Sequence, residues 1–179
     1  MIEISFMQAE LAFLVAWIAI RVLICLRRGA VDWRHEALLV LMYVNLAVII
    51  RFSFFPLATD AGRVQPLVFD ASRVFPLRMN LVPFKQLLWY DTTRDLIINL
   101  AGNVAMFIPT GIIMPIIWPG LDRAWKAIGA GMLIPLCIEL CQLPFAARAS
   151  DVDDLILNAT GIALGYAIYA LARRARPRS

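Results

Sequence analysis

Charged side chains are scarce in this sequence. Asp, Glu, Lys and Arg make up 17% of its 179 residues, whereas 61% are hydrophobic and the mean hydropathy is +0.75. Soluble domains carry roughly a quarter charged residues and about half apolar ones. A core formed by a chain of this length cannot bury so much apolar surface, so lipid must cover the remainder. The composition therefore excludes a soluble domain and predicts an integral membrane protein.

Residues that support nucleophilic or metal chemistry are also few. The chain has one histidine, His35, and three cysteines, Cys25, Cys137 and Cys141, which lie in apolar runs. There is no CxxC pair, no Cys/His metal spacing, no P-loop and no DxxDG alcohol-phosphotransferase motif. The cysteines are expected to act as small apolar side chains. No resident cofactor is predicted.

The beginning of the chain lacks basic residues, since Glu3 and Glu10 come before the first arginine, Arg21. A cleavable signal peptide begins with positive charge, so the first apolar run is predicted to be a retained helix. Most other basic residues form short clusters at the ends of apolar runs. This placement is typical of topology determinants beside anionic lipid, and it argues against a nucleic-acid partner.

Five apolar stretches follow along the chain, each near the ~20 residues that cross the hydrocarbon as a helix. They cover approximately residues 4–26, 37–55, 96–118, 127–145 and 155–172. The period-two pattern of a membrane barrel is absent. The sequence predicts an all-α membrane protein, a bundle of about five transmembrane helices that forms a single domain over residues 1–179.

The connections between these helices predict an orientation. Basic residues lie in the first and third connections and in the tail: Arg27, Arg28, Arg34, Arg123, Lys126, Arg173, Arg174, Arg176 and Arg178. The positive-inside rule then places the N-terminus outside and the C-terminus in the cytoplasm. The long outer loop, residues 56–95, contains five prolines or glycines and several aromatic residues. Its segment Phe84–Tyr90 is predicted to lie in the membrane interface.

Polar side chains within the predicted helices gather near their outer ends. The helical ones are Arg51, Asn99, Asn103, Glu139, Gln142 and Asn158, and the turn before the last helix adds Arg148, Asp151, Asp153 and Asp154. Polar groups at membrane depth are costly and usually mark a functional site. The carboxylates of the acidic trio are also the ligand type that Mg²⁺ or another hard cation takes, so a divalent cation is an open alternative there.

Ordinary helix packing would account equally well for part of this set. The three asparagines are also suited to hydrogen bonding between helices, and Gly161 with Gly165 is typical of close helix contact. Ser150 with Asp153 fits a capping box at the start of the last helix. Glu139 has no neighbouring charge in sequence. It is predicted to pair with Arg148 or Arg51, to be protonated, or to be a ligand.

The same residues carry a family resemblance. The segments Asn80–Lys85, Asn99–Gly111, Glu139–Gln142, Arg148–Asn158 and Gly161–Tyr166 resemble, in order, the "NLxPF", "N..GN...F.P.G", "E..Q", "R..D.DD...N" and "G...GY" motifs of the VanZ-like family. The resemblance covers about half the chain, residues 80–169. It implies a multi-pass protein of the bacterial cytoplasmic (inner) membrane. It also implies a role in the cell envelope, with the family's founding member lowering susceptibility to the lipid-tailed glycopeptide teicoplanin.

Three functions remain open. In the first, the protein binds a cell-wall lipid intermediate or a lipoglycopeptide. Arg51, Lys85 and Arg148 would hold phosphate or carboxylate groups. Asn80, Asn99 and Asn103 would add hydrogen bonds. The acidic trio would position the arginines or accept hydrogen bonds from sugar or peptide.

The second function is an intramembrane enzyme acting on a lipid-linked or phospholipid substrate, with Glu139 as general acid or base. The third is a small lipid transporter or flippase with a proton site at Glu139. One chain of this length would need to form an oligomer to build a path, and no inverted repeat is visible.

Overall fold

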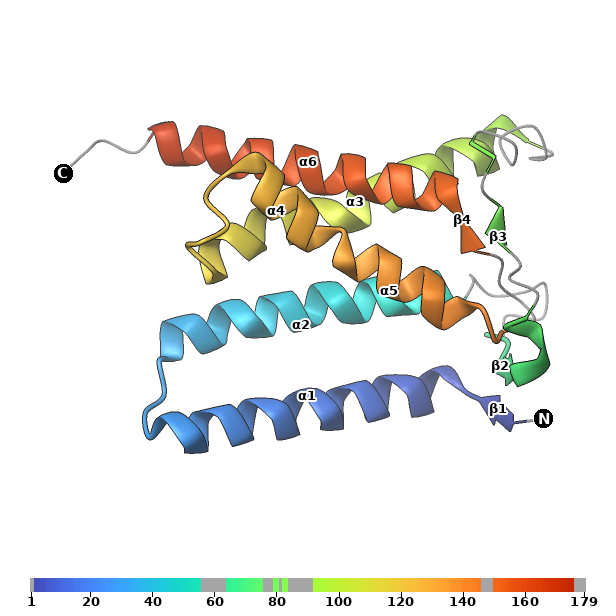
Figure 1. The fold of residues 1–179 in the computed structure, drawn as a ribbon, viewed down its shortest axis with the longest axis horizontal. Coiled ribbons are helices and arrows are strands. Elements are labelled where there is room, and N and C mark those ends of the chain that lie inside the picture. The colour runs from blue at the N-terminus through green and yellow to red at the C-terminus, as the bar shows by residue number, and fades with distance from the viewer. Residues whose placement is uncertain are drawn as a thin grey trace.

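A computed structural model of the chain shows helices that run side by side as a bundle (Figure 1). It describes residues 2–55, 64–75, 79–80, 82–83, 92–145 and 150–175. Five helical spans in these ranges are long and apolar enough to cross a membrane. The predicted fold class is confirmed, and the protein is a multi-pass membrane protein.

The first two helices, α1 (Phe6–Arg28) and α2 (Trp33–Phe54), form a hairpin. Ser5 begins α1 as a capping box with Gln8, and Gly29 ends it in the left-handed region, at φ 67°. Helix α1 has no buried residue and lies at the edge of the bundle (Figure 1). Its surface is therefore left for lipid.

An ion pair and a stacked ring pair are among the contacts that hold α1 against α2. The Arg21 guanidinium of α1 forms an ion pair with the Glu36 carboxylate of α2. Phe13 stacks on Tyr43, with ring centroids 5.2 Å apart. Because a charge in hydrocarbon needs a partner, the ion pair lets both residues occupy apolar helices.

The closest helix pair is α3 (Thr93–Ile117) with α6 (Val152–Ala175). A Cβ at Gly161 or Gly165 would overlap a backbone carbonyl of α3, and a Cβ at Gly111 would overlap one of α6. The two backbones touch where these glycines lie. The predicted packing role of Gly161 and Gly165 is confirmed, and Gly111 supplies the facing surface.

The fourth span consists of two helices, α4 (Ala124–Gly131) and α5 (Leu133–Gln142), which meet at Met132. The sequence predicted one continuous helix here. Pro135 explains the interruption, because it has no N–H to donate to the carbonyl four residues earlier, that of Gly131. The break changes the direction of α5 as it approaches the polar region (Figure 1).

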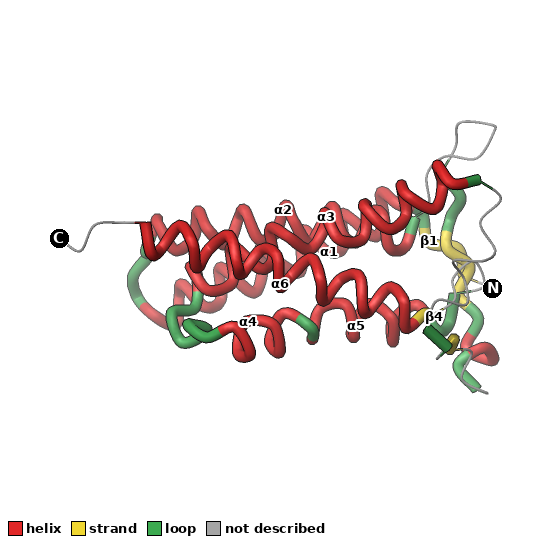
Figure 2. The backbone as a smooth tube through the Cα atoms, turned by 90° about the horizontal axis from the view of Figure 1, so that it is seen from above, coloured by secondary structure: helices red, strands yellow, loops and turns green. Residues whose placement is uncertain are grey.

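Four short strands lie at one end of the bundle, which we call the strand end (Figures 1 and 2). Strand β1 (Ile2–Ile4) pairs antiparallel with β2 (Leu67–Phe69), and β3 (Met79–Asn80) pairs parallel with β4 (Ser150–Asp151). A 3₁₀ turn, Ala71–Arg73, follows β2. None of these elements was predicted from the sequence.

The long loop is therefore partly ordered into strands. Its predicted interfacial segment, Phe84–Tyr90, lies outside the described residues. At the other end of the bundle, which we call the opposite end, lie the α1–α2 and α3–α4 turns and the last residues of α6 (Figure 1).

Candidate functional site

Three carboxylates are buried at the strand end. The exposed fractions are 2% for Glu139, 5% for Asp151 and 8% for Asp153. Glu139 lies near the end of α5, and the two aspartates lie where α6 begins. Acidic residues are almost never this buried unless their oxygens are hydrogen-bonded or paired. The role of this region therefore depends on the groups that hydrogen-bond to these carboxylates.

Asp151 is the centre of this network. One of its carboxylate oxygens accepts the Asp153 backbone N–H at 3.0 Å, and both oxygens lie 3.2 Å from Asn80 Nδ2. Since α6 begins at Val152, Asp151 is its N-cap. The capping box of Ser150 with Asp153 stays a prediction, because the Ser150 side chain lies outside what the structure describes. Asp151 thus joins strand β3 to the start of α6.

Glu139 reaches the same point from α5. Its Oε2 accepts the backbone N–H of Asp151 at 3.0 Å. A carboxylate near the positive end of a helix is stabilised by the helix dipole as well as by this hydrogen bond. Glu139 therefore helps to hold β4 in place. The pairing, protonation and ligand roles expected for it stay predictions.

Helix α3 contributes two asparagines one turn apart. Asn103 Nδ2 donates to Asp154 Oδ1 at 2.9 Å, which links α3 to α6. Asn99 is half-buried and makes no side-chain hydrogen bond to another described residue. On α6, Asn158 is buried, and its Oδ1 has no hydrogen-bond partner among the described residues. The two asparagines of α3 thus differ: Asn103 is hydrogen-bonded to α6, whereas the Asn99 side chain bonds to no other described residue.

The hydrogen bonds given for Asp151 and Asp154 lead to different elements. Asp154 bonds to α3, whereas Asp151 bonds to β3 and to the backbone beside it. Over the described ranges, no three His, Cys, Asp or Glu side chains are arranged to hold a metal ion. The described geometry gives the predicted divalent-cation site no support.

Helix α2 ends beside this network. Gln142 Nε2 of α5 donates to the Ser53 carbonyl at 2.7 Å. Arg51 donates to the Phe55 carbonyl, and its guanidinium lies 5.0 Å from the centre of the Phe6 ring. The strand end therefore brings together Arg51, Asn80, Asn99, Asn103, Glu139, Gln142, Asp151, Asp153, Asp154 and Asn158. The other two predicted ligands, Lys85 and Arg148, lie outside the described residues.

Several polar residues of the bundle were not predicted from the sequence. Glu10 of α1 interacts electrostatically with Arg51. Within the core, Thr110 donates to Asn45 Oδ1 at 2.7 Å, and Asn45 Nδ2 donates to the Met106 carbonyl at 2.9 Å. A charge or an amide in an apolar run could have identified Glu10 and Asn45. Thr110 carries no such signal.

Comparison with known proteins identifies the family. The sequence profile of the VanZ/LLP1 family matches residues 39–173, well over half of the chain. The chain belongs to the VanZ/LLP1 family. The match includes the predicted motif region, residues 80–169, and extends back into α2, while α1 lies before it. Every predicted site residue falls inside it.

One similar relative is Protein VanZ of Enterococcus faecium, which is 28% identical over 96 residues. The aligned region is 54% of this chain and 55% of that protein, so the chain spans about half the length of this relative. No solved structure matches the chain.

Proposed function

We propose that this VanZ-family protein binds the polar headgroup of a cell-envelope lipid intermediate, or a lipoglycopeptide, at the strand end. The observation that carries the proposal is the buried network around Asp151, which fixes β3 to β4 at the end of the bundle. Such a network positions backbone and side chains at headgroup depth. A lipid can reach this depth without leaving the bilayer.

The occupied carboxylates favour binding over catalysis. Glu139 and Asp151 already accept donors that hold the strand pair together, and both are almost fully buried. Asn99 lies at the same end as a donor for a ligand, and Arg51 adds positive charge there. Lys85 and Arg148 are close in sequence to Asn80 and Asp151. Guanidinium groups hold phosphate or carboxylate through charge-assisted hydrogen bonds. We therefore propose an anionic headgroup as the ligand, and reduced teicoplanin susceptibility as one consequence of binding.

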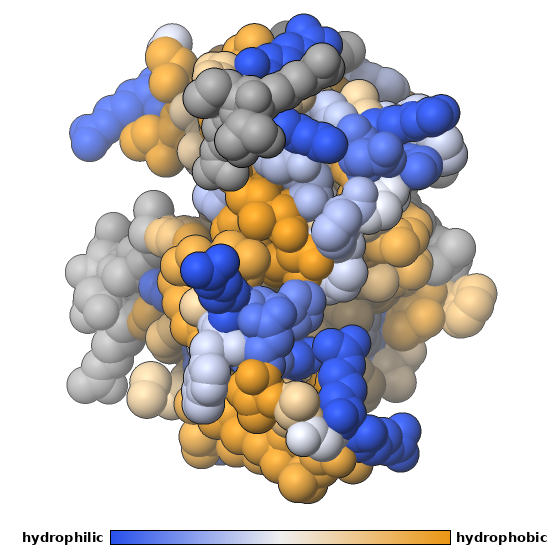
Figure 3. Space-filling model, turned by 90° about the vertical axis from the view of Figure 1, so that its left-hand side faces the viewer, coloured by the Kyte–Doolittle hydropathy of each residue, from blue (hydrophilic) through white to orange (hydrophobic). Residues whose placement is uncertain are grey.

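We also propose that the strand end faces the outside of the bacterial inner membrane. The described basic residues of the opposite end are Arg27, Arg28, Arg34, Arg123, Lys126, Arg173 and Arg174. Figure 3 views this end and shows hydrophilic side chains projecting among apolar ones. The positive-inside rule assigns this end to the cytoplasm. A membrane-impermeant thiol reagent should then label Ser5→Cys in intact spheroplasts and not Gly120→Cys; the reverse pattern would invert the topology.

The two α3 asparagines give a matched test of binding. Asn99→Ala should leave the free energy of unfolding within about 0.5 kcal/mol, because this side chain bonds to no other described residue. Asn103→Ala should cost about 1–3 kcal/mol, because Asp154 loses a hydrogen bond. We expect Asn99→Ala to weaken headgroup binding about tenfold, a loss of about 1.4 kcal/mol.

Binding is measured with the full chain in nanodiscs, titrated with a lipid-linked wall precursor and with teicoplanin. Arg148→Lys serves as a second variant, since lysine cannot form the forked contact of arginine. The glycopeptide core without its lipid tail separates headgroup recognition from lipid partition. Equal affinities for the wild type and for both Asn99→Ala and Arg148→Lys would refute the proposed site.

A further inference from the structure

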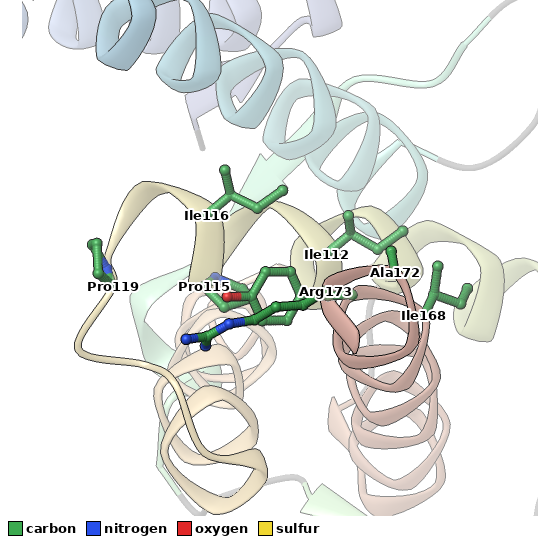
Figure 4. A pocket seen from close by; sticks show the side chains of 8 residues that line it. Ile112, Pro115, Ile116, Pro119, Ile168, Ala172 and Arg173 are labelled. Atoms are coloured by element: carbon green, nitrogen blue, oxygen red, sulfur yellow. The ribbon is translucent and has the colours of Figure 1, made fainter. Parts of the chain in front are cut away.

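A cavity lies at the opposite end of the bundle, far from the strand-end network. It has a volume of about 420 Å³ and lies between the last turns of α3 and α6 (Figure 4). Its lining residues are Ile112, Pro115, Ile116, Pro119, Ile168, Tyr169, Ala172 and Arg173. This volume is within the range of small-ligand sites, roughly 300–1,000 Å³.

The origin of the cavity is visible in the sequence of the two helices. The backbones touch at Gly111, Gly161 and Gly165. One turn further along, Pro115 of α3 and Ile168 of α6 line the cavity. The groove therefore opens where the glycine contact ends.

The wall is apolar and its polar groups come from the last turns of α6. They are the Tyr169 hydroxyl and the Arg173 guanidinium, and Figure 4 shows Arg173 extending beside Pro115. Arg173 is exposed and forms no ion pair within the described part of the chain. An apolar groove with a single cation at its mouth is complementary to an acyl chain with an anionic headgroup.

The depth of Arg173 along the bundle is consistent with binding a lipid headgroup. It follows the first residue of α6, Val152, by a rise of about 32 Å, close to the ~30 Å thickness of the hydrocarbon. The indole side chains of Trp33, Trp118 and Trp125 are exposed at the same end. Tryptophans of this kind mark the headgroup level. Arg173 thus lies where a phospholipid phosphate lies.

We propose that this cavity binds one acyl chain of an anionic phospholipid, whose phosphate is held by Arg173 and the Tyr169 hydroxyl. The lipid belongs to the leaflet at the opposite end. It wedges between α3 and α6 and fixes the spacing of these helices beyond their glycine contact. This site is independent of the function proposed for the strand end.

The test is native mass spectrometry of the full chain, released from micelles that contain phosphatidylglycerol and phosphatidylcholine with identical chains. The wild type should retain phosphatidylglycerol in preference to phosphatidylcholine. Arg173→Gln should lower phosphatidylglycerol retention at least fivefold. Arg27→Gln removes an exposed arginine at the same end of the bundle but away from the cavity, and should change retention less than twofold.

A second variant tests the acyl-chain part of the proposal. Ala172→Phe fills the groove and should lower retention of both lipids, with the protein still monodisperse by size exclusion. Retention equal to wild type in Arg173→Gln would overturn the headgroup contact. If Arg27→Gln lowered phosphatidylglycerol retention as much as Arg173→Gln, the lipid would be held only by general charge attraction to this end of the protein, which would overturn the proposed site. Unchanged lipid retention in Ala172→Phe would show that the lipid does not bind in the cavity.

Discussion

Replacing Asp151 with alanine is expected to lower the free energy of unfolding by about 2–4 kcal/mol. The change removes the N-cap of α6, worth typically ~1 kcal/mol, and leaves the Asn80 amide and the Asp153 N–H without their acceptor. It also removes the side-chain contact between β3 and β4. The measurement is equilibrium unfolding of the purified protein in mixed micelles of increasing dodecyl sulfate content.

Two further variants give this prediction its controls. Asp151→Asn keeps a good N-cap and one acceptor, so it should lose less than half as much stability. Asp122→Ala removes an exposed carboxylate at the opposite end, where the hydrogen bond from Lys126 holds the pKa of Asp122 below its ordinary value. An exposed ion pair contributes little, so this variant should unfold like wild type. Equal stabilities for Asp151→Ala and Asp122→Ala would mean that Asp151 is not a structural centre.

Adding a methyl group at the α3–α6 contact should have an effect of similar size. Gly161→Ala and Gly165→Ala place a Cβ against a backbone carbonyl, which cannot move aside as a side chain does. We expect a loss of about 1–3 kcal/mol for each, and more for the double variant, because the helices must separate. The same unfolding titration measures it.

Gly129→Ala is the matched control for these variants. Gly129 also lies within a helix, α4, but a Cβ there has no neighbour within 4 Å. Since alanine favours the helix over glycine, this variant should be as stable as wild type or slightly more stable. If Gly165→Ala were equally well tolerated, the helices would not be in backbone contact at that position.

Much of the bundle could be predicted because its signals are local. An apolar run near twenty residues indicates a span, and the spacing of Gly161 and Gly165 indicates a packing face. The convergence of Asn103 with Asp154 follows from depth, since each lies near the same end of its helix. These inferences need no knowledge of which helices are neighbours.

The rest depends on contacts that a sequence does not display. Strands of two or three residues have no periodicity, and the Asn80–Asp151 contact joins positions 71 apart. One partner of Glu139 is a backbone N–H, a group that every residue except proline carries, so nothing in the sequence marks Asp151 as its donor. At the start of α6 the sequence offers two good capping residues side by side, Ser150 and Asp151, and local preference alone does not separate them.

We propose that the strand end binds an envelope lipid and does not transform it. The most direct test is mass spectrometry of envelope lipids and wall precursors. The samples are cells that carry the wild type, Asn99→Ala, Glu139→Gln or an empty vector, together with the lipids that co-purify with each protein. We predict identical cellular lipid profiles and one anionic lipid that co-purifies with the wild type and is depleted from Asn99→Ala. A lipid species that appears or disappears in cells with the wild type, and not with Glu139→Gln, would contradict the account and make the protein an enzyme.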